Sequence, residues 1–190
     1  MTATEPEPTM PVEAEAESEQ TETAAEVVEF TLGEERCALD IESVDSIVET
    51  KQITRVPRAP EAVEGVMDLR GETTAVVDPK NFLSVGSSAA AESILVIDRA
   101  DDKQKIGIRV DDVQEVTSYP RAQVDRNGDL SGIETSAIEA KLVKGVLRKY
   151  IGEVDDDGIP EDVQLVLWLD IDQLIDSVTV EEETATNNQV

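Results

Sequence analysis

Residues 63–83 read VEGVMDLRGETTAVVDPKNFL, in which the apolar-alternating segment 66–69 is followed by Arg70-Gly71, and a second apolar segment, 74–77, is followed by an aspartate-proline step. Such segments predict short strands, with Arg70 at or near the end of the first. Asp78 is suited to cap a helix whose first residue is Pro79. The stretch therefore predicts strands that run into a short helix.

A degenerate internal repeat carries this pattern through the chain. Segment 63–66 (VEGV) corresponds to 143–146 (VKGV). Four further pairs of segments or residues match in the same way: 39–47 with 108–116, 57–59 with 120–122, Gly71 with Gly152, and 77–78 with 169–170. Apolar residues fall at matching places in both copies. Because a repeat dictates the architecture of a protein, we interpret the chain as two structurally similar units.

Both units are expected to be small β-barrels. Each opens with a predicted hairpin, formed by Val27 to Leu32 with Arg36 to Asp40, and by Ser93 to Asp98 with Lys105 to Val110. Five-strand units with such frequent turn signals predict a mainly β protein, with two SH3- or OB-like barrels packed together and short helices. We assign the first barrel to about 27–90 and the second to about 91–177, and leave open whether the two are intertwined.

Two acidic ends flank the predicted barrels. Residues 1–26 contain eight acids and no base, and residues 176–190 contain four acids. Segments with so little apolar surface cannot offset the entropy lost on ordering. We therefore expect residues 1–26 and 178–190 to be disordered tails.

The predicted folded part is itself strongly acidic. The whole chain has a net charge of −27, and −15 remains when residues 1–26 and 176–190 are set aside. Such a surface repels nucleic-acid phosphates and anionic membranes, so neither is an expected partner. The charge indicates a halophilic protein of a salt-rich cytoplasm, where screening shortens charge repulsion. We predict that the melting temperature rises with potassium chloride concentration; a melting temperature that falls as salt is added would contradict this.

The cellular location and the role of the single cysteine are predicted from what the sequence lacks. No apolar run approaches the ~20 residues of a membrane span, and the N-terminus has no signal-peptide pattern. We expect a soluble, cytoplasmic protein. Cys37 lies in an alternating strand pattern and is expected to be a core residue, because no histidine is present to activate its thiol.

Enzymatic motifs are missing from the sequence. It has no histidine, Gly-rich phosphate loop, nucleophile elbow or Cys/His cluster. Residues 123–134 match several positions of an EF-hand loop, but Gln123 replaces the first aspartate and Pro120 would break the incoming helix. We expect no catalytic residue, no cofactor and no metal site.

Comparison of the two units draws attention to Arg70, because Ile151 stands at the matching place before Gly152. The repeated scaffold therefore does not require an arginine there. A guanidinium near a strand end can pair locally with Asp68 or Glu72, or it can reach a partner protein. Both interpretations are open on the sequence alone, since surface ion pairs are common.

The sequence around Arg70 resembles the signature of the CheW-like domain family. The resemblance rests on GVMDLRG at 65–71, TAVVD at 74–78, FTLG at 30–33, ALDI at 38–41, ITRVP at 53–57 and IGIRVDDV at 106–113. The likeness covers about residues 26–177. It implies a stand-alone, non-catalytic chemotaxis adaptor, recruited to membrane receptor arrays and built from two intertwined five-stranded barrels.

The resemblance also implies two partners and a set of partner-binding residues. The partners are the CheW-like regulatory domain of the histidine kinase CheA and the cytoplasmic tip of methyl-accepting chemotaxis receptors. Arg70 matches the arginine of the receptor-binding surface, while Val44 and Ile47 match a segment near the groove between the barrels. Gly65 and Gly71 belong to the motif that contains Arg70. For Val44 and Ile47, core packing is an equally weighted alternative.

A different class of function is also open to a small barrel, namely the binding of single-stranded nucleic acid or oligosaccharide. Stacking sites for such ligands need aromatic side chains and, for nucleic acid, a basic groove. Only 3% of the residues are aromatic, and no basic groove is predicted. The sequence therefore favours the adaptor over this alternative.

Overall fold

The computed structural model describes residues 23–81, 83, 85–86, 93–98, 104–126, 138–154 and 158–186. Its strands are β1 (Thr23–Leu32), β2 (Glu35–Asp40), β3 (Val44–Glu49), β4 (Val63–Leu69), β5 (Glu72–Val77), β6 (Ser93–Ile97), β7 (Lys105–Val110), β8 (Asp112–Pro120), β9 (Val124–Asp125), β10 (Val143–Val154) and β11 (Pro160–Leu169). Its helices include the 3-10 turns η1 (Ile41–Ser43), η2 (Pro79–Asn81), η3 (Arg121–Gln123) and η5 (Ala140–Leu142), and the α-helix α2 (Ile171–Thr186).

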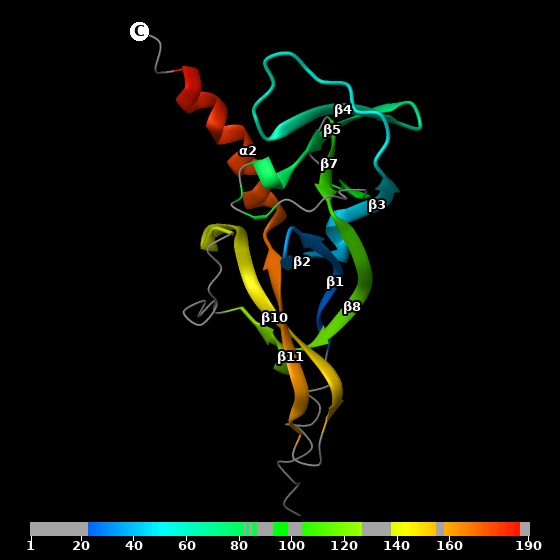
Figure 1. Ribbon diagram of the computed structural model, residues 1–190, viewed down its shortest axis with the longest axis vertical. Helices are drawn as coiled ribbons and strands as arrows, with labels where there is room; N and C mark the ends of the chain where they lie inside the picture. Colours follow the sequence, from blue (N-terminus) through cyan, green and yellow to red (C-terminus); the bar gives the residue numbers. More distant parts are fainter. Residues whose placement is uncertain are drawn as a thin grey trace, which may run out of the picture.

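The strands form two sheets that exchange their opening hairpins (Figure 1). Sheet 1 has the order β8-β1-β2-β11-β10-β9, and sheet 2 has the order β3-β6-β7-β5-β4. The first hairpin, β1–β2, thus pairs with the closing strands of the second repeat, through antiparallel β8 and parallel β11. The second hairpin, β6–β7, pairs in the same way with β3 and β5 of the first repeat. This mainly β arrangement of two packed barrels confirms the predicted fold class.

The exchange corrects the predicted boundary between the barrels. Sheet 2 lies within residues 44–110, whereas sheet 1 combines residues 23–40 with 112–169. The sheets therefore do not follow the approximate division into 27–90 and 91–177, and the two units are intertwined, the possibility that the sequence left open. The physical reason is that the edge backbone groups of each hairpin find their hydrogen-bond partners in the other repeat. Sheet 1 also has a sixth strand, because the two-residue β9 pairs with β10.

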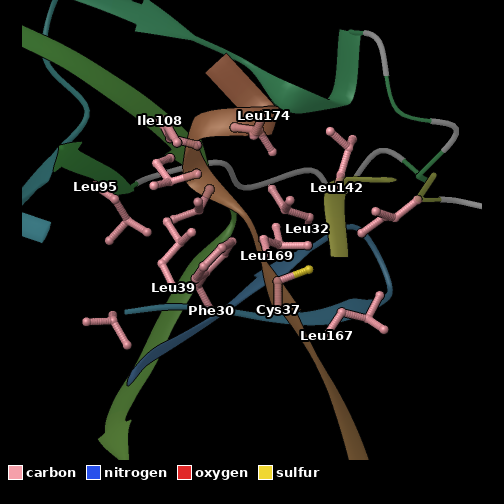
Figure 2. Close-up of a cluster of buried hydrophobic side chains, with 14 of the residues drawn as sticks. Phe30, Leu32, Cys37, Leu39, Leu95, Ile108, Leu142, Leu167, Leu169 and Leu174 are labelled. Atoms are coloured by element: carbon pink, nitrogen blue, oxygen red, sulfur yellow. The ribbon is translucent and has the colours of Figure 1, made fainter. Parts of the chain in front are cut away.

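The largest apolar core lies where the two sheets meet (Figure 2). Phe30 comes from sheet 1, Leu95 and Ile108 come from sheet 2, and Leu174 comes from α2. Each large apolar side chain buried in this way contributes about 1.5–3 kcal/mol, so the cluster ties the two sheets and the helix together. Cys37 belongs to the same cluster, and burial raises the pKa of its thiol, which confirms the prediction of a core cysteine.

The N-terminal boundary of the fold differs from the predicted one. β1 begins at Thr23, four positions before Val27, because its first residues pair with the end of β8. Ala25 lies opposite Tyr119 and is buried. Strand pairing thus orders residues that composition assigned to a disordered tail. Segment 1–22 lies outside the described residues.

The C-terminal boundary also differs. α2 continues to Thr186, whereas the fold was predicted to end at residue 177. Val178 explains part of the difference, because it is buried against Ala62 and Val77. Among the described helices, none combines the length and the apolar character that crossing a membrane requires.

Two aspartates cap the helices as predicted. Asp78 Oδ1 accepts a hydrogen bond from the Lys80 backbone nitrogen at 3.0 Å, at the start of η2. Asp170 Oδ1 accepts one from the Gln173 backbone nitrogen at 3.1 Å, at the start of α2. These bonds satisfy backbone donors that have no partner within the helix.

A buried carboxylate lies within sheet 1. The side chain of Glu29 is 2% exposed and accepts hydrogen bonds from Tyr119 Oη at 2.7 Å and from Lys149 Nζ at 2.8 Å. Lys149 also contacts Glu115 at 2.6 Å. Burial alone would raise the pKa of Glu29, but the hydrogen bonds from Lys149 and Tyr119 outweigh it and hold the pKa below its ordinary value. Glu29 therefore remains a charged group inside the fold.

Candidate partner-binding site

The β4–β5 hairpin presents Arg70 and Gly71 as its two-residue turn, between the paired residues Leu69 and Glu72. Both turn residues have positive φ angles, 55° for Arg70 and 88° for Gly71, as a type I′ turn requires. Asp68 Oδ1 accepts a hydrogen bond from the Gly71 backbone nitrogen at 3.1 Å. Glycine tolerates this conformation, whereas a residue with a side chain loses about 1–2 kcal/mol in it. The stability of the turn therefore does not explain why residue 70 is an arginine.

The Arg70 side chain is exposed, and none of the described carboxylates forms an ion pair with it. Both acids that the sequence offered as local partners have other contacts. Asp68 accepts the turn hydrogen bond, and Glu72 pairs with Lys105 at 3.2 Å. The interpretation of Arg70 as a local salt bridge is therefore not supported within the described part of the chain, and its guanidinium donors face solvent.

The predicted residues Val44 and Ile47 lie on β3, an edge strand of sheet 2, and point to opposite faces. Val44 is half-buried and packs against the main core, so core packing accounts for it. Ile47 is 46% exposed, beside the exposed residues Asp45 and Glu49. Of the two, only Ile47 offers an apolar surface to a partner.

Sheet pairing brings Val44 and the Arg70 turn to the same end of sheet 2. β3 begins there, as do β5 and β7, while β4 ends there at the turn. Lys105 spans this end, because its Nζ lies 3.5 Å from Asp45 and 3.2 Å from Glu72. The hydrogen bond to Glu72 and the charge of Asp45 raise the pKa of Lys105, so it stays protonated. This end of sheet 2 carries a network of charges beside Arg70, which pairs with none of the described carboxylates.

Gly65 has a structural role in the same sheet. A Cβ atom on Gly65 would lie 2.4 Å from the carbonyl oxygen of Thr54. Thr54 forms a two-way backbone bridge with Val66, at 2.8 and 2.9 Å, and this bridge links the β3–β4 connection to β4. Gly65 is buried, so it shapes the barrel and is not exposed to a partner.

Lys105 was missed by the sequence interpretation. Its place at the start of a predicted strand was visible, but its pairing with Asp45 and Glu72 depends on the parallel contact of β5 with β7 and on the antiparallel contacts of β6 with β3 and β7. These contacts join segments that are far apart in the chain and have no local signal. Asp45 and Glu72 therefore could not be identified from the sequence as the ion-pair partners of Lys105.

Comparison with known proteins finds relatives over most of the fold. The sequence-family model of the CheW-like domain matches residues 26–179 of this chain. A chemotaxis protein CheW of Thermotoga maritima is 29% identical over 157 residues, which cover 83% of this chain and 91% of the relative. A chemotaxis protein CheW of Treponema pallidum is 30% identical over 129 residues, covering 65% of this chain and 73% of the relative.

A solved structure agrees with the arrangement of the two sheets. The crystal structure of the scaffolding protein TtCheW from Thermoanaerobacter tengcongensis superimposes with a TM-score of 0.60 and 26% sequence identity. The superposition covers 77% of this chain and 84% of that protein. The residues matched by the family model, 26–179, include the Arg70 turn, most of β1 and the first part of α2. The chain belongs to the CheW-like domain family.

Proposed function

We propose that this chain is a coupling adaptor of chemotaxis, which binds a histidine kinase and a receptor at the same time. It joins the regulatory domain of CheA to the cytoplasmic tip of methyl-accepting receptors and is thereby recruited to membrane receptor arrays. It acts without catalysis, by raising the effective concentration of its partners and by linking the receptor's conformational state to the kinase.

The observation that carries the proposal is the backbone conformation of Arg70 together with the exposure of its side chain. The arginine occupies a left-handed turn position at a cost in stability, and its guanidinium is exposed without a described ion-pair partner. Strain of this kind, kept at an exposed residue, is typical of a functional site. A guanidinium fork suits a carboxylate or a backbone carbonyl of a partner helix. Exposed Ile47 on β3 supplies a candidate apolar contact.

Family membership does not favour the alternative, a binding module for single strands or oligosaccharides. Only Tyr150 is an exposed large aromatic residue among those described, and Trp168 is buried. A stacking platform needs several exposed rings. The adaptor is therefore the better-supported function.

Substitution of Arg70 tests the receptor half of the proposal. Arg70→Glu should weaken binding to a receptor cytoplasmic fragment by at least about tenfold, because it replaces an interfacial donor with a repelling charge. Binding to the CheA regulatory domain should be unchanged. Both affinities are measured by calorimetry with purified partners, at the same potassium chloride concentration.

Two further variants serve as controls for this test. Lys141→Glu makes the same charge change at an exposed residue of η5 and should leave both affinities unchanged. Arg70→Asn suits the left-handed turn, so it should leave the fold at least as stable as the wild type while still losing the receptor. Full receptor affinity in both Arg70 variants would refute the assignment of Arg70.

A further inference from the structure

Three arginines line one pocket at the point where β1 begins. The pocket has a volume of about 600 Å³. Arg121 comes from η3, Arg126 follows β9, and Arg148 comes from β10, while Thr23 and Ala24 of β1 form part of the rim. We call it the arginine pocket.

The charge of this pocket is opposite to that of the protein. The chain has 16 basic and 43 acidic residues. Among the described residues that line it, the pocket nevertheless contains three guanidinium groups and a single carboxylate, that of Asp125. Such a local excess of positive charge attracts anions strongly against a negative background.

Contacts with the residues that the structure describes do not neutralise the three arginines. Arg121 forms no ion pair with any residue that the structure describes. Arg148 lies 3.4 Å from Asp125, which is a weak contact, and Arg126 donates to the carbonyl oxygen of Ala24 at 3.0 Å. One carboxylate cannot balance three guanidinium groups, and each of these retains free donors in a planar fork suited to carboxylates.

A second pocket, of about 450 Å³, continues along the same wall and shares Ala24 and Arg126. Trp168, which is 4% exposed, lies there under Arg126 at 5.2 Å and under Lys144 at 4.3 Å. Its indole nitrogen is buried and has no hydrogen-bond partner in the described structure. Acidic residues line this second pocket as well, so the arginine pocket is the better site for an anion.

We propose that the arginine pocket binds a carboxylate-rich peptide and that its occupant is segment 1–22 of this chain. The segment contains seven glutamates and no base. It is joined to the fold at Thr23, on the rim of the pocket. Covalent attachment at this point gives an effective concentration on the order of millimolar, enough for weak charge pairs to form. The segment would then compete with any acidic partner for the pocket.

The test uses a full-length variant in which the segment is neutralised by glutamate-to-glutamine changes at positions 5, 7, 13, 15, 17, 19 and 22. A synthetic peptide of residues 1–22 is added, and binding is followed by calorimetry and by the fluorescence of Trp168, the single tryptophan. The peptide should bind this variant in 0.1 M potassium chloride and bind much more weakly in 1 M, where the Debye length is about 3 Å.

Two matched pairs of substitutions locate the binding. Arg121→Gln with Arg148→Gln should weaken peptide binding by about tenfold, since each removes a charge-assisted contact. Lys51→Gln with Arg55→Gln changes the net charge equally at exposed residues outside the pocket and should weaken it by less than about twofold. Absence of binding, or an equal loss in both pairs, would overturn the pocket assignment.

The wild-type chain distinguishes the two possible sources of the acidic peptide. With its own segment in the pocket, it should bind the added peptide about tenfold more weakly than the neutralised variant. Equal affinity for the two chains would overturn the assignment of segment 1–22. The pocket would then be a site for an acidic segment of a partner.

Discussion

Lys149→Met should lower the free energy of unfolding by about 3 kcal/mol, because it leaves the charge of Glu29 without its cationic partner. Glu29 is almost fully buried, and the Lys149 side chain is 19% exposed, so solvent screens the pair only in part. Tyr119 would remain as a donor to Glu29, but a hydroxyl group does not balance a negative charge. Urea unfolding followed by far-UV circular dichroism measures the change.

A comparison with an exposed lysine isolates the effect of burial. Lys141→Met removes the ion pair with Glu139, in which both side chains are more than 60% exposed, and should cost less than about 1 kcal/mol. Glu29→Gln added to Lys149→Met should restore part of the loss, because it removes the unpaired charge. Similar losses in the two lysine variants would contradict the role of the buried pair.

The same cluster makes part of the stability depend on pH. The pKa of Glu29 is held below its ordinary value of 4.5 in the folded state, so its stabilising contribution is complete above that value. It is lost as the pH falls through the folded pKa. The difference in unfolding free energy between wild type and Glu29→Gln should therefore shrink on acidification below pH 4.5.

Gly65→Ala should lower the free energy of unfolding by about 2–3 kcal/mol, because the new methyl group would overlap the Thr54 carbonyl oxygen. That atom belongs to backbone, so relief requires movement of the β3–β4 connection and loss of the bridge to Val66. Thermal unfolding of the variant measures the cost.

Gly71→Ala provides the matched change in the same hairpin. No atom lies within 4 Å of a Cβ placed there, so the expected loss is only the left-handed strain of about 1 kcal/mol. A larger loss for Gly71→Ala than for Gly65→Ala would contradict the structural role assigned to Gly65. Receptor affinity, measured well below both melting temperatures, would then show whether either glycine also contributes to binding.

Local features of the fold could be predicted from the sequence, whereas long-range pairing could not. The hairpins at 27–40 and 93–110 and the caps at Asp78 and Asp170 rest on neighbouring residues, and they were predicted correctly. The contact of β1 with β8 joins segments of opposite repeats, and either repeat alone offered a plausible barrel. Pairing between distant strands depends on the whole fold and not on local preference.

The same distinction applies to the candidate site. The repeat singled out Arg70, because a matching isoleucine showed that the scaffold can do without it. Its left-handed backbone and lack of an ion-pair partner among the described residues required coordinates. Strand alternation placed Val44 and Ile47 on opposite faces, but which face is buried depends on how the two sheets pack.

The exchange of hairpins has a consequence for synthesis on the ribosome. The β1–β2 hairpin leaves the exit tunnel long before its neighbours, β8 beside β1 and β11 beside β2, and translation at about 5–20 residues per second separates these events by several seconds. During that interval the nascent β1–β2 hairpin has two open edges that could pair with other chains. Sheet 1 can close only after Leu169 has emerged from the tunnel. Until then, the edges of the β1–β2 hairpin are protected from other chains only if the hairpin itself forms late or if a chaperone binds it.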